Sequence, residues 1–231
     1  METILKAKKI IKTYHDGDKI TPVLKGIDLS FPRGSFFSIT GKSGTGKSTL
    51  LYSLSLLDNP TSGEIFLGKD NIPANTLSTK KRVRYRLENF GFVFQYYALI
   101  PEMLAWENVA VPMLMLGESK DVAKERAIEV LKRLGLGERF DHLPSQLSGG
   151  ESQRVSIARS IAHKPKILFA DEPTANLDTE RSKQVIDIFK ELNEEGQSIV
   201  MVTHEEEYAR EAKKMIVIQD GKIIKEEELR K

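Results

Sequence analysis

The sequence predicts an α/β fold built on a mostly parallel β-sheet that is covered on both faces. Short, continuous apolar runs alternate with segments of helical periodicity, which is typical of strands buried between two layers. A glycine-rich loop follows one of these runs and precedes a helical segment. The length of 231 residues and the hydrophobic content of 40% suit one large globular domain, and no internal repeat or linker is visible.

Strand signals dominate the chain up to residue 95. Period-two alternation predicts the strands, and turn-prone residues between them mark their ends. Strands at 23–31 and 35–40 form a second strand pair, joined by a turn at Pro32–Gly34. The expected elements, in order, are strands at 3–14, 23–31 and 35–40, a helix from Lys47, and strands at 64–68 and 90–95.

The segment from residue 96 to residue 160 changes to helical character and separates two strand-rich parts. Apolar residues from Val122 to Leu134 recur every three to four positions, and Gly135 is expected to end that helix. The elements expected after this insert are strands at 166–170 and 198–202, a helix with its apolar face at 185–192, and a hairpin at 215–225.

The glycine-rich loop has the G-x-x-x-x-G-K-[ST] spacing of a phosphate-binding loop. Glycine alone tolerates the backbone angles and the close approach that let N–H groups surround the β- and γ-phosphates. Lys47 is expected to reach these phosphates, and the Ser48 hydroxyl is expected to bind Mg²⁺. The predicted nucleotide-binding residues of the loop are Gly41, Lys42, Ser43, Gly44, Thr45, Gly46, Lys47, Ser48 and Thr49.

Four polar residues follow apolar strands, at the sheet edge where open α/β sheets bind their ligands. Asp171 is expected to hold Mg²⁺ directly or through water, and Glu172 to polarise the attacking water as a general base. Gln95 is expected to contact the Mg²⁺ or the water, and His204 the γ-phosphate. The structural alternatives are an ordinary strand-end turn at Asp171 and an ordinary histidine at position 204.

The sequence Leu147–Glu151, L-S-G-G-E, indicates a second phosphate-binding helix end. Locally it is a capping box that starts a helix, with Ser148 as the N-cap and Glu151 three residues later. Gly149 and Gly150 leave the first N–H groups of that helix open to an anion. Two such helix ends in one chain suggest a nucleotide that is held between two copies of the chain.

The remaining composition excludes several classes of function. A formal net charge of +2 is too small to indicate nucleic-acid binding, and the absence of cysteine excludes disulfides and thiolate metal sites. The basic run Lys80–Arg86 is expected to be a solvated helix face, with a surface near anionic lipid or a partner as the alternative. No apolar run is long enough to span a bilayer, so we expect a cytosolic protein or one held to a membrane by a partner.

Several motifs in this order resemble those of the ATP-binding subunits of ABC transporters over essentially the whole chain. The resemblance implies one P-loop NTPase domain at 1–231, with an N-terminal antiparallel β part, a catalytic core at 1–95 and 161–231, and a helical subdomain at 96–160. The matching residues are Gly41 to Thr49, Gln95, Leu147 to Glu151 with Gln153 and Arg154, Ile167 to Glu172, Asn176 to Asp178, and His204.

The resemblance further implies a Mg²⁺-dependent ATPase that works as a homodimer with ATP at the interface. Tyr14 would stack on adenine, and Asp178 would couple the two sites. A membrane permease would receive the motion, which implies the cytoplasmic face of the cell (inner) membrane. Its docking groove is expected at 95–115, with an apolar surface formed by Leu99, Trp106, Met113 and Met115.

A finer similarity is to the ATPases of lipoprotein-release, macrolide-export and cell-division systems, which this chain alone does not separate. Glu151 stands where that family usually has glutamine, and because a carboxylate would repel the γ-phosphate we expect it to turn back to its helix N-terminus. Ala175 stands where serine or glycine is common. Two rival functions are a soluble ABC-type ATPase that acts on ribosomes or DNA and a regulatory nucleotide-binding module with little turnover. The residues that carry the finer similarity are Leu57 to Gly63, Gly91 to Gln95, Leu99 to Pro101 and Glu107 to Val109.

Overall fold

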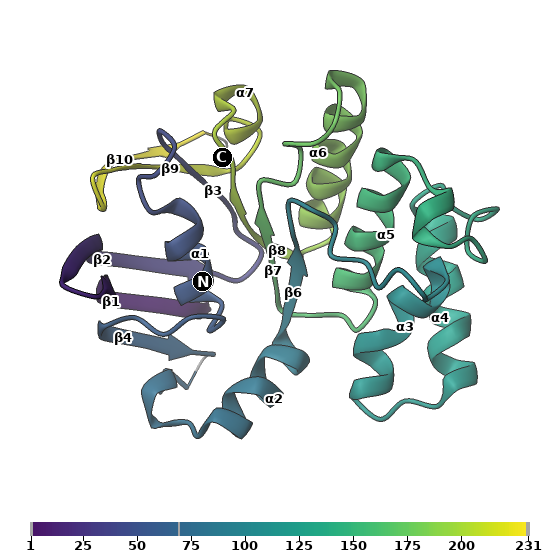
Figure 1. Cartoon of the computed structure of the whole chain (residues 1–231), viewed down its shortest axis with the longest axis horizontal. Coiled ribbons are helices and arrows are strands. Elements are labelled where there is room, and N and C mark those ends of the chain that lie inside the picture. The colour runs from purple at the N-terminus through teal and green to yellow at the C-terminus, as the bar shows by residue number, and fades with distance from the viewer. Residues whose placement is uncertain (1, 69, 230–231) are drawn as a thin grey trace.

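The computed structural model describes residues 2–68 and 70–229, and within them the strands form two sheets (Figure 1). The larger sheet has six strands in the order β10-β9-β3-β8-β7-β6. Its strands β9, β3, β8, β7 and β6 are mutually parallel, and only β10 runs antiparallel to its neighbour. This confirms the predicted mostly parallel sheet. Its strands are β3 (Phe36–Thr40), β6 (Phe90–Val93), β7 (Ile167–Asp171), β8 (Ser198–Val202), β9 (Lys214–Gln219) and β10 (Lys222–Glu228).

The central strands of this sheet are buried on both faces. Successive side chains of β7 point to opposite sides, so Ile167 and Phe169 join one hydrophobic cluster and Leu168 and Ala170 join the other. Helices cover the Leu168 face, whereas helix α1 (Lys47–Leu54) and the second sheet cover the Phe169 face. The continuous apolar runs of the sequence therefore correspond to strands between two layers.

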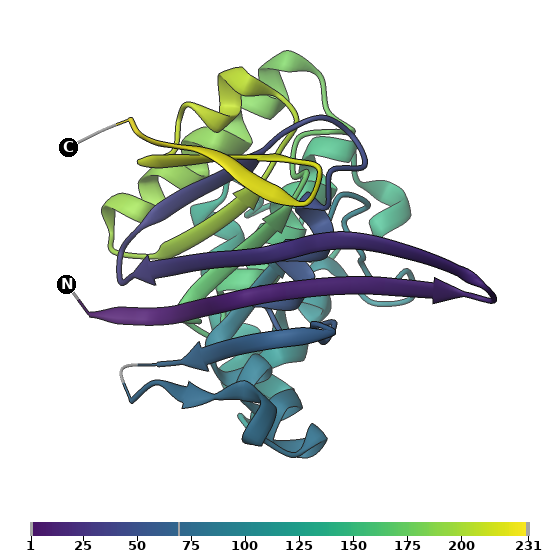
Figure 2. The same cartoon turned by 90° about the vertical axis from the view of Figure 1, so that its left-hand side faces the viewer.

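The second sheet is antiparallel, with the strand order β2-β1-β4-β5. Its strands β1 and β2 form a long hairpin that reaches beyond the body of the protein (Figure 2). The strands of this sheet are β1 (Thr3–Asp16), β2 (Lys19–Pro32), β4 (Ser62–Leu67) and β5 (Ile72–Pro73).

The predicted pairing of strands 23–31 and 35–40 is wrong. The turn after Pro32 joins β2 of the antiparallel sheet to β3 of the parallel sheet, and the two strands do not pair. The burial of their side chains explains the separation: all five residues of β3 are buried, whereas β2 alternates between buried and exposed positions. A strand that is apolar on both faces needs a cover on each side, which only the central layer provides.

Helices α3, α4 and α5 lie together beside the parallel sheet, on the right in Figure 1. Helix α4 ends before Gly135, whose positive φ of 73° suits a helix end, as predicted. None of the helices in the described part of the chain has both the length and the apolar character needed to cross a membrane. The helices after α1 are α2 (Thr79–Asn89), α3 (Ala105–Met115), α4 (Lys120–Arg133), α5 (Gly149–Ile161), α6 (Thr179–Glu194) and α7 (Glu206–Ala209), with short 3₁₀ turns at Ala74–Thr76 and Pro144–Gln146.

Candidate nucleotide site

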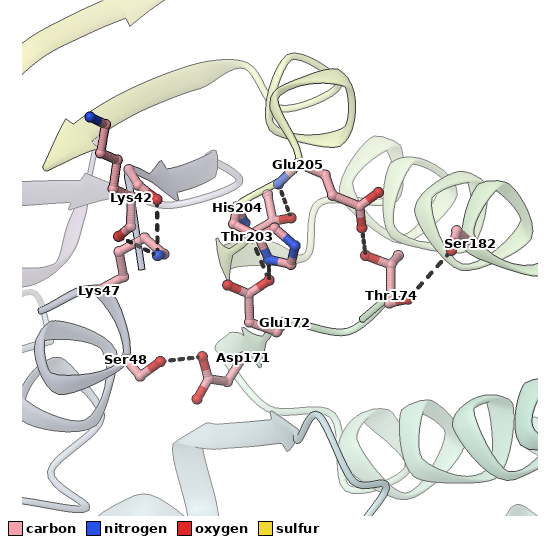
Figure 3. Close-up of polar contacts among 11 residues, drawn as sticks. Lys42, Lys47, Ser48, Asp171, Glu172, Thr174, Ser182, Thr203, His204 and Glu205 are labelled. Carbon is pink, nitrogen blue, oxygen red and sulfur yellow. Dashed lines mark hydrogen bonds and ion pairs between the residues drawn. The ribbon is translucent and has the colours of Figure 1, made fainter. Parts of the chain in front are cut away.

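The phosphate loop connects β3 to α1, as its spacing predicts. A side chain at Gly41 would place its Cβ 2.2 Å from the Ile218 carbonyl oxygen, and φ there is +149°, so this position requires glycine. The buried Lys47 ammonium donates hydrogen bonds to the carbonyl oxygens of Gly41 at 3.0 Å and Lys42 at 3.1 Å (Figure 3). The carbonyl oxygens of the loop therefore hold the Lys47 ammonium in place beside the loop.

A cavity of about 520 Å³ opens beside the loop. It brings together residues that are far apart in the sequence: the loop, the ends of three strands, and the turn after Glu172. Of the residues predicted for the site, Gln95, Glu172 and His204 line this cavity with six residues of the loop and its helix. The lining residues are Val23, Ser43, Gly44, Gly46, Lys47, Ser48, Thr49, Gln95, Glu172, Ala175 and His204.

Ser48 lines this cavity, and the predicted metal ligand Asp171, which does not line it, contacts the Ser48 side chain. The Ser48 hydroxyl donates to Asp171 Oδ1 at 2.8 Å, and the Tyr52 hydroxyl donates to Asp171 Oδ2 at 2.6 Å. Burial, and then the hydrogen bond to the Asp171 carboxylate, raise the pKa of Tyr52 well above its usual range. A hydroxyl beside a buried carboxylate is an oxygen donor set that suits Mg²⁺, so these residues fit the predicted metal.

Glu172 and His204 form a pair across the ends of β7 and β8. His204 Nδ1 lies 2.8 Å from Glu172 Oε2, and the backbone N–H of His204 donates to the same oxygen at 3.2 Å (Figure 3). Glu172 has a positive φ of 47°, a conformation that few non-glycine residues adopt. This backbone turns the Glu172 carboxylate toward His204 while the adjacent Asp171 side chain meets Ser48.

Gln95 is fixed through its backbone. Its carbonyl oxygen accepts a hydrogen bond from the Asn176 side chain at 2.7 Å. Tyr97 and Ala98, which follow shortly after Gln95, also have positive φ. The Arg159 guanidinium donates hydrogen bonds to their carbonyl oxygens, at 2.8 Å for Tyr97 and 2.6 Å for Ala98. The segment after Gln95 is therefore tied both to the turn that precedes α6 and to α5.

Tyr14 lies next to the loop but does not line the cavity. Its ring is 43% exposed, its hydroxyl donates to Asp58 Oδ2 at 2.9 Å, and the Lys12 ammonium lies 4.8 Å from the ring centroid. Lys12 also donates to Asp58 Oδ1 at 2.7 Å. Burial alone would raise the pKa of Asp58, but the hydrogen bonds from Lys12 and Tyr14 outweigh it and lower that pKa.

The L-S-G-G-E segment forms the predicted capping box at the start of α5. Ser148 Oγ accepts from the Glu151 N–H at 3.3 Å, and Glu151 Oε2 accepts from the Ser148 N–H at 2.8 Å. Glu151 thus turns back to the helix N-terminus as expected, and its other oxygen accepts from Arg139 Nε at 3.0 Å. The Ser148 N–H first, and then the hydrogen bonds from the Ser148 and Arg139 side chains, lower the pKa of Glu151 to about 2.

The structure does not bring this second helix end into the cavity. Neither the L-S-G-G-E residues nor Asp178 line it. Asp178 instead caps α6, where its side chain accepts from the Arg181 N–H at 2.9 Å. One copy of the chain therefore presents two separate sets of the predicted nucleotide-binding residues. The residues concerned are Ser148, Gly149, Gly150, Glu151 and Asp178.

The expected docking groove is only partly where the sequence places it. Trp106 and Met113 are buried in the core cluster of α3, α4 and α5, because their spacing puts them on the inner face of α3. Met115 is 61% exposed and does line an apolar groove, of about 350 Å³, between α2 and the end of α3. Leu99 is half-buried against the same core cluster as Trp106 and does not line the groove.

A model of the ABC transporter family matches residues 24–175. The chain belongs to the ABC transporter family. This ABC-family chain is 50% identical to the lipoprotein-releasing system ATP-binding protein LolD of Aquifex aeolicus, with 98% of each chain covered. It is 44% identical to the macrolide export ATP-binding/permease protein MacB of Chlorobium phaeobacteroides, with 98% of this chain and 34% of that protein covered.

A solved structure supports the same assignment. It is the dimeric post-hydrolysis state of the ATP-binding cassette MJ0796 bound to ADP and Pi, which matches with a TM-score of 0.90 and 42% identity over 99% of this chain and 100% of that one. The chain is thus the ATP-binding ATPase subunit of an ABC transporter, and its predicted similarity to lipoprotein-release and macrolide-export ATPases is confirmed.

Sequence reasoning missed several residues that shape this ABC site. Lys12 and Asp58 hold Tyr14, and Tyr52 holds Asp171. The position of Tyr52 beside the site could have been predicted, because Tyr52 stands four residues after Ser48 and therefore lies on the same face of α1. The contact between Lys12 and Asp58 could not have been predicted, because no local sequence pattern relates two residues that are 46 positions apart.

Proposed function

We propose that two copies of this ATPase close around Mg²⁺-ATP, with each nucleotide held between the phosphate loop of one copy and Ser148–Gly150 of the other. The observation that supports this is the division of the site within one copy. Lys47, Glu172 and His204 lie at the cavity, whereas the start of α5 lies elsewhere in the same chain. The cassette MJ0796, which has the same fold, is dimeric with ADP and Pi.

The contacts within the cavity suggest a role for each residue. Lys47 and the loop N–H groups bind the β- and γ-phosphates, and Ser48 and Asp171 hold Mg²⁺, which neutralises phosphate charge when bound. Glu172 takes the proton of the attacking water, and His204 orients the Glu172 carboxylate through the 2.8 Å contact and binds the γ-phosphate. Gln95, which follows β6 and lines the cavity, contacts the metal or the water. Two further assignments rest on the family resemblance: Tyr14 stacks on adenine, and Asp178 couples the two sites.

Glu172→Gln tests this assignment, because the amide cannot accept the proton but retains the shape of the carboxylate. The variant is expected to bind ATP, to lose nearly all turnover, and to form a dimer that ATP stabilises. Phosphate release and light scattering with and without Mg²⁺-ATP measure both properties. Glu207→Gln, at an exposed position of α7, is the matched control. Turnover at the wild-type rate in Glu172→Gln would refute the role of Glu172.

We also propose that a membrane permease receives the motion, at the cytoplasmic face of the cell membrane. The groove between α2 and α3 supports this, because an apolar surface next to the Gln95 segment suits a protein partner that follows the state of the nucleotide site. The similarity to LolD and MacB favours a complex of the lipoprotein-release or macrolide-export type. The predicted division into a core and a helical subdomain at 96–160 would place the groove where these two parts meet.

The partner is tested by affinity purification of the tagged chain from detergent-solubilised native membranes, followed by mass spectrometry. A membrane protein that is recovered stoichiometrically supports the permease. Ribosomal or DNA-repair partners, with no membrane protein in several detergents, would favour the soluble rival and leave the ATPase chemistry intact. A turnover rate near zero in the complete wild-type complex would instead favour the regulatory module.

A further inference from the structure

Glu172 has a backbone conformation that the surrounding structure must stabilise. Its positive φ of 47° is unfavourable for a residue with a side chain and persists only where neighbouring groups fix it. The Glu172 N–H donates to the Val202 carbonyl oxygen at 2.9 Å, and the Glu172 carbonyl oxygen accepts from the Ala175 N–H at 3.2 Å. Pro173 comes next and has no N–H, so its carbonyl oxygen is the backbone group through which this residue can be anchored.

Gln153 of α5 provides that anchor. Its Nε2 atom donates to the Pro173 carbonyl oxygen at 2.6 Å, and the side chain is fully buried. The Gln153 Oε1 atom has no hydrogen-bond partner among the described residues, so the contact with Pro173 fixes the orientation of this amide. A hydrogen bond away from water is stronger than one at the surface, so the buried amide holds the backbone next to Glu172 in place.

The next residue of the turn is held from the other side. The Thr174 hydroxyl donates to Glu205 Oε1 at 3.1 Å, and the Ser182 hydroxyl donates to the Thr174 carbonyl oxygen at 3.5 Å (Figure 3). Glu205 directly follows His204, so the first of these bonds ties Thr174 to the strand end that carries His204. The turn is therefore anchored to α5 at one residue, and to α6 and the end of β8 at the next.

The position of Gln153 on α5 relates it to the second helix end. Gln153 stands four residues after Gly149 and therefore lies on the same face of the helix. In the proposed dimer, Ser148–Gly150 of each copy contacts the nucleotide that the other copy binds. One short helical segment would then connect the contact with one nucleotide to the turn that carries Glu172, the general base for the other.

We infer that Gln153 is a positioning residue for ATP hydrolysis, whose amide holds the Pro173 carbonyl group and so keeps the Glu172 carboxylate aimed at the attacking water. This inference rests on the function proposed above for Glu172. A general base must lie within hydrogen-bond reach of the proton that it takes, and a displacement of about 1 Å can lower the rate by about 100-fold. Gln153 does not line the cavity, so loss of its anchor is expected to slow hydrolysis more than it weakens nucleotide binding.

Gln153→Met tests this inference, because methionine has a similar length and cannot donate a hydrogen bond to Pro173. We expect kcat for phosphate release to fall by about tenfold or more, with the Kd for ATP, measured by calorimetry, close to the wild-type value. The ATP-bound dimer, followed by light scattering, is expected to last longer than the wild-type dimer, because its ATP is hydrolysed more slowly. An unchanged kcat would overturn the inference.

The lifetime of the dimer separates this role from simple support of the start of α5. If Gln153 only stabilised that helix end, Gln153→Met would weaken the contact of Ser148–Gly150 with the nucleotide of the other copy. Dimer formation would then require more ATP, and the dimer would dissociate sooner. An ATP-bound dimer of Gln153→Met that lasts no longer than the wild-type dimer would therefore overturn the inference.

Ser156→Ala is the matched control. Ser156 lies three residues after Gln153 on the same face of α5 and is also fully buried, and its hydroxyl has no hydrogen-bond partner within the described part of the chain. This variant is expected to keep the wild-type kcat and dimer lifetime. An equal loss of kcat in both variants would overturn the inference in favour of a general loosening of α5. If Gln153→Met does not fold, Gln153→Asn replaces it, because the shorter amide cannot reach the Pro173 carbonyl oxygen.

Glu172→Gln, measured in the same assays, separates this inference from the proposed function on which it rests. Wild-type turnover in Glu172→Gln would refute the general base, whatever Gln153→Met does. If Glu172→Gln is inactive and Gln153→Met has the wild-type kcat, only the role of Gln153 fails. If the wild-type chain forms no dimer with ATP, the dimer proposal fails, and the change in kcat at an unchanged Kd for ATP decides the present inference.

Discussion

Replacement of Tyr14 by alanine is expected to weaken ATP binding while the affinity for inorganic tripolyphosphate stays unchanged. The Tyr14 ring lies beside the phosphate loop, and its environment includes Thr49 of that loop. Lys12 lies over one face of the Tyr14 ring, and Tyr14 is 43% exposed, so a base would stack on the opposite face. Tripolyphosphate contains the phosphates of ATP without the base, which makes it the reference ligand.

The size of the effect follows from this single stacking face. One base stacked on one aromatic ring contributes about 1–3 kcal/mol, which corresponds to a Kd for ATP that is roughly 5- to 150-fold higher in Tyr14→Ala. Tyr14→Phe keeps the ring and loses the hydrogen bond to Asp58, so the expected loss is less than about fivefold.

Isothermal titration of the wild-type protein and both variants with ATP and with tripolyphosphate, at fixed Mg²⁺, gives the six affinities needed. An equal loss for both ligands in Tyr14→Ala would refute the reasoning, because it would mean that the ring supports the loop rather than the base. A loss in Tyr14→Phe as large as in Tyr14→Ala would mean that the hydroxyl, and not the stacking face, is responsible.

Three further predictions concern the metal site, the core and the second helix end. Tyr52→Phe removes the 2.6 Å hydrogen bond that holds the Asp171 carboxylate. The Mg²⁺ concentration that gives a half-maximal effect on ATP binding, measured by calorimetry, is therefore expected to rise by about tenfold or more. An unchanged Mg²⁺ dependence would contradict this prediction. Phe169→Ala empties the space of a fully buried ring in β7, and we expect the free energy of unfolding in denaturant titrations to fall by about 3–5 kcal/mol, whereas a loss below about 1 kcal/mol would argue against the two-layer packing. The pKa of Glu151 in the folded protein is lowered from its ordinary value of 4.5 to about 2, so the stability that Glu151 contributes is present above pH 4.5 and is lost as the pH falls toward 2. Glu151→Gln is expected to flatten this part of the profile of unfolding free energy against pH. Identical profiles for the variant and the wild type would show that Glu151 contributes nothing.

Local patterns were sufficient to predict the strands and the residues at their ends. The apolar run before Asp171 forms β7, and the run before His204 forms β8, with both polar residues at the same end of the sheet. The phosphate loop was equally readable, because its function depends on the types of a few consecutive residues. The start of α5 was predicted from Ser148 and Glu151 for the same reason.

Features that depend on the choice between two buried environments could not be predicted. The alternation of apolar and polar residues in β2 does not indicate with which strand β2 pairs, so only the structure shows that β2 and β3 belong to different sheets. Trp106 and Met113 are large apolar residues whether they face a partner or the core, and only the packing of α3 on α4 and α5 decides. The Lys12–Asp58 pair depends on a contact between distant parts of the chain.

Helix α1 joins the two ends of the nucleotide site in one rigid element. The phosphate loop leads directly into it at Lys47, and Asp58, which holds Tyr14, follows shortly after its end, where the Asp58 N–H donates to the Tyr52 carbonyl oxygen at 3.1 Å. The eight residues of α1 span about 12 Å, so the length of this helix fixes the separation between the phosphate loop and the contact of Asp58 with Tyr14. In the proposed binding mode, the length of α1 therefore sets the distance between the loop that holds the phosphates and the Tyr14 ring that holds the base, and a change that lengthened or shortened α1 by one residue would rotate Asp58 away from Tyr14.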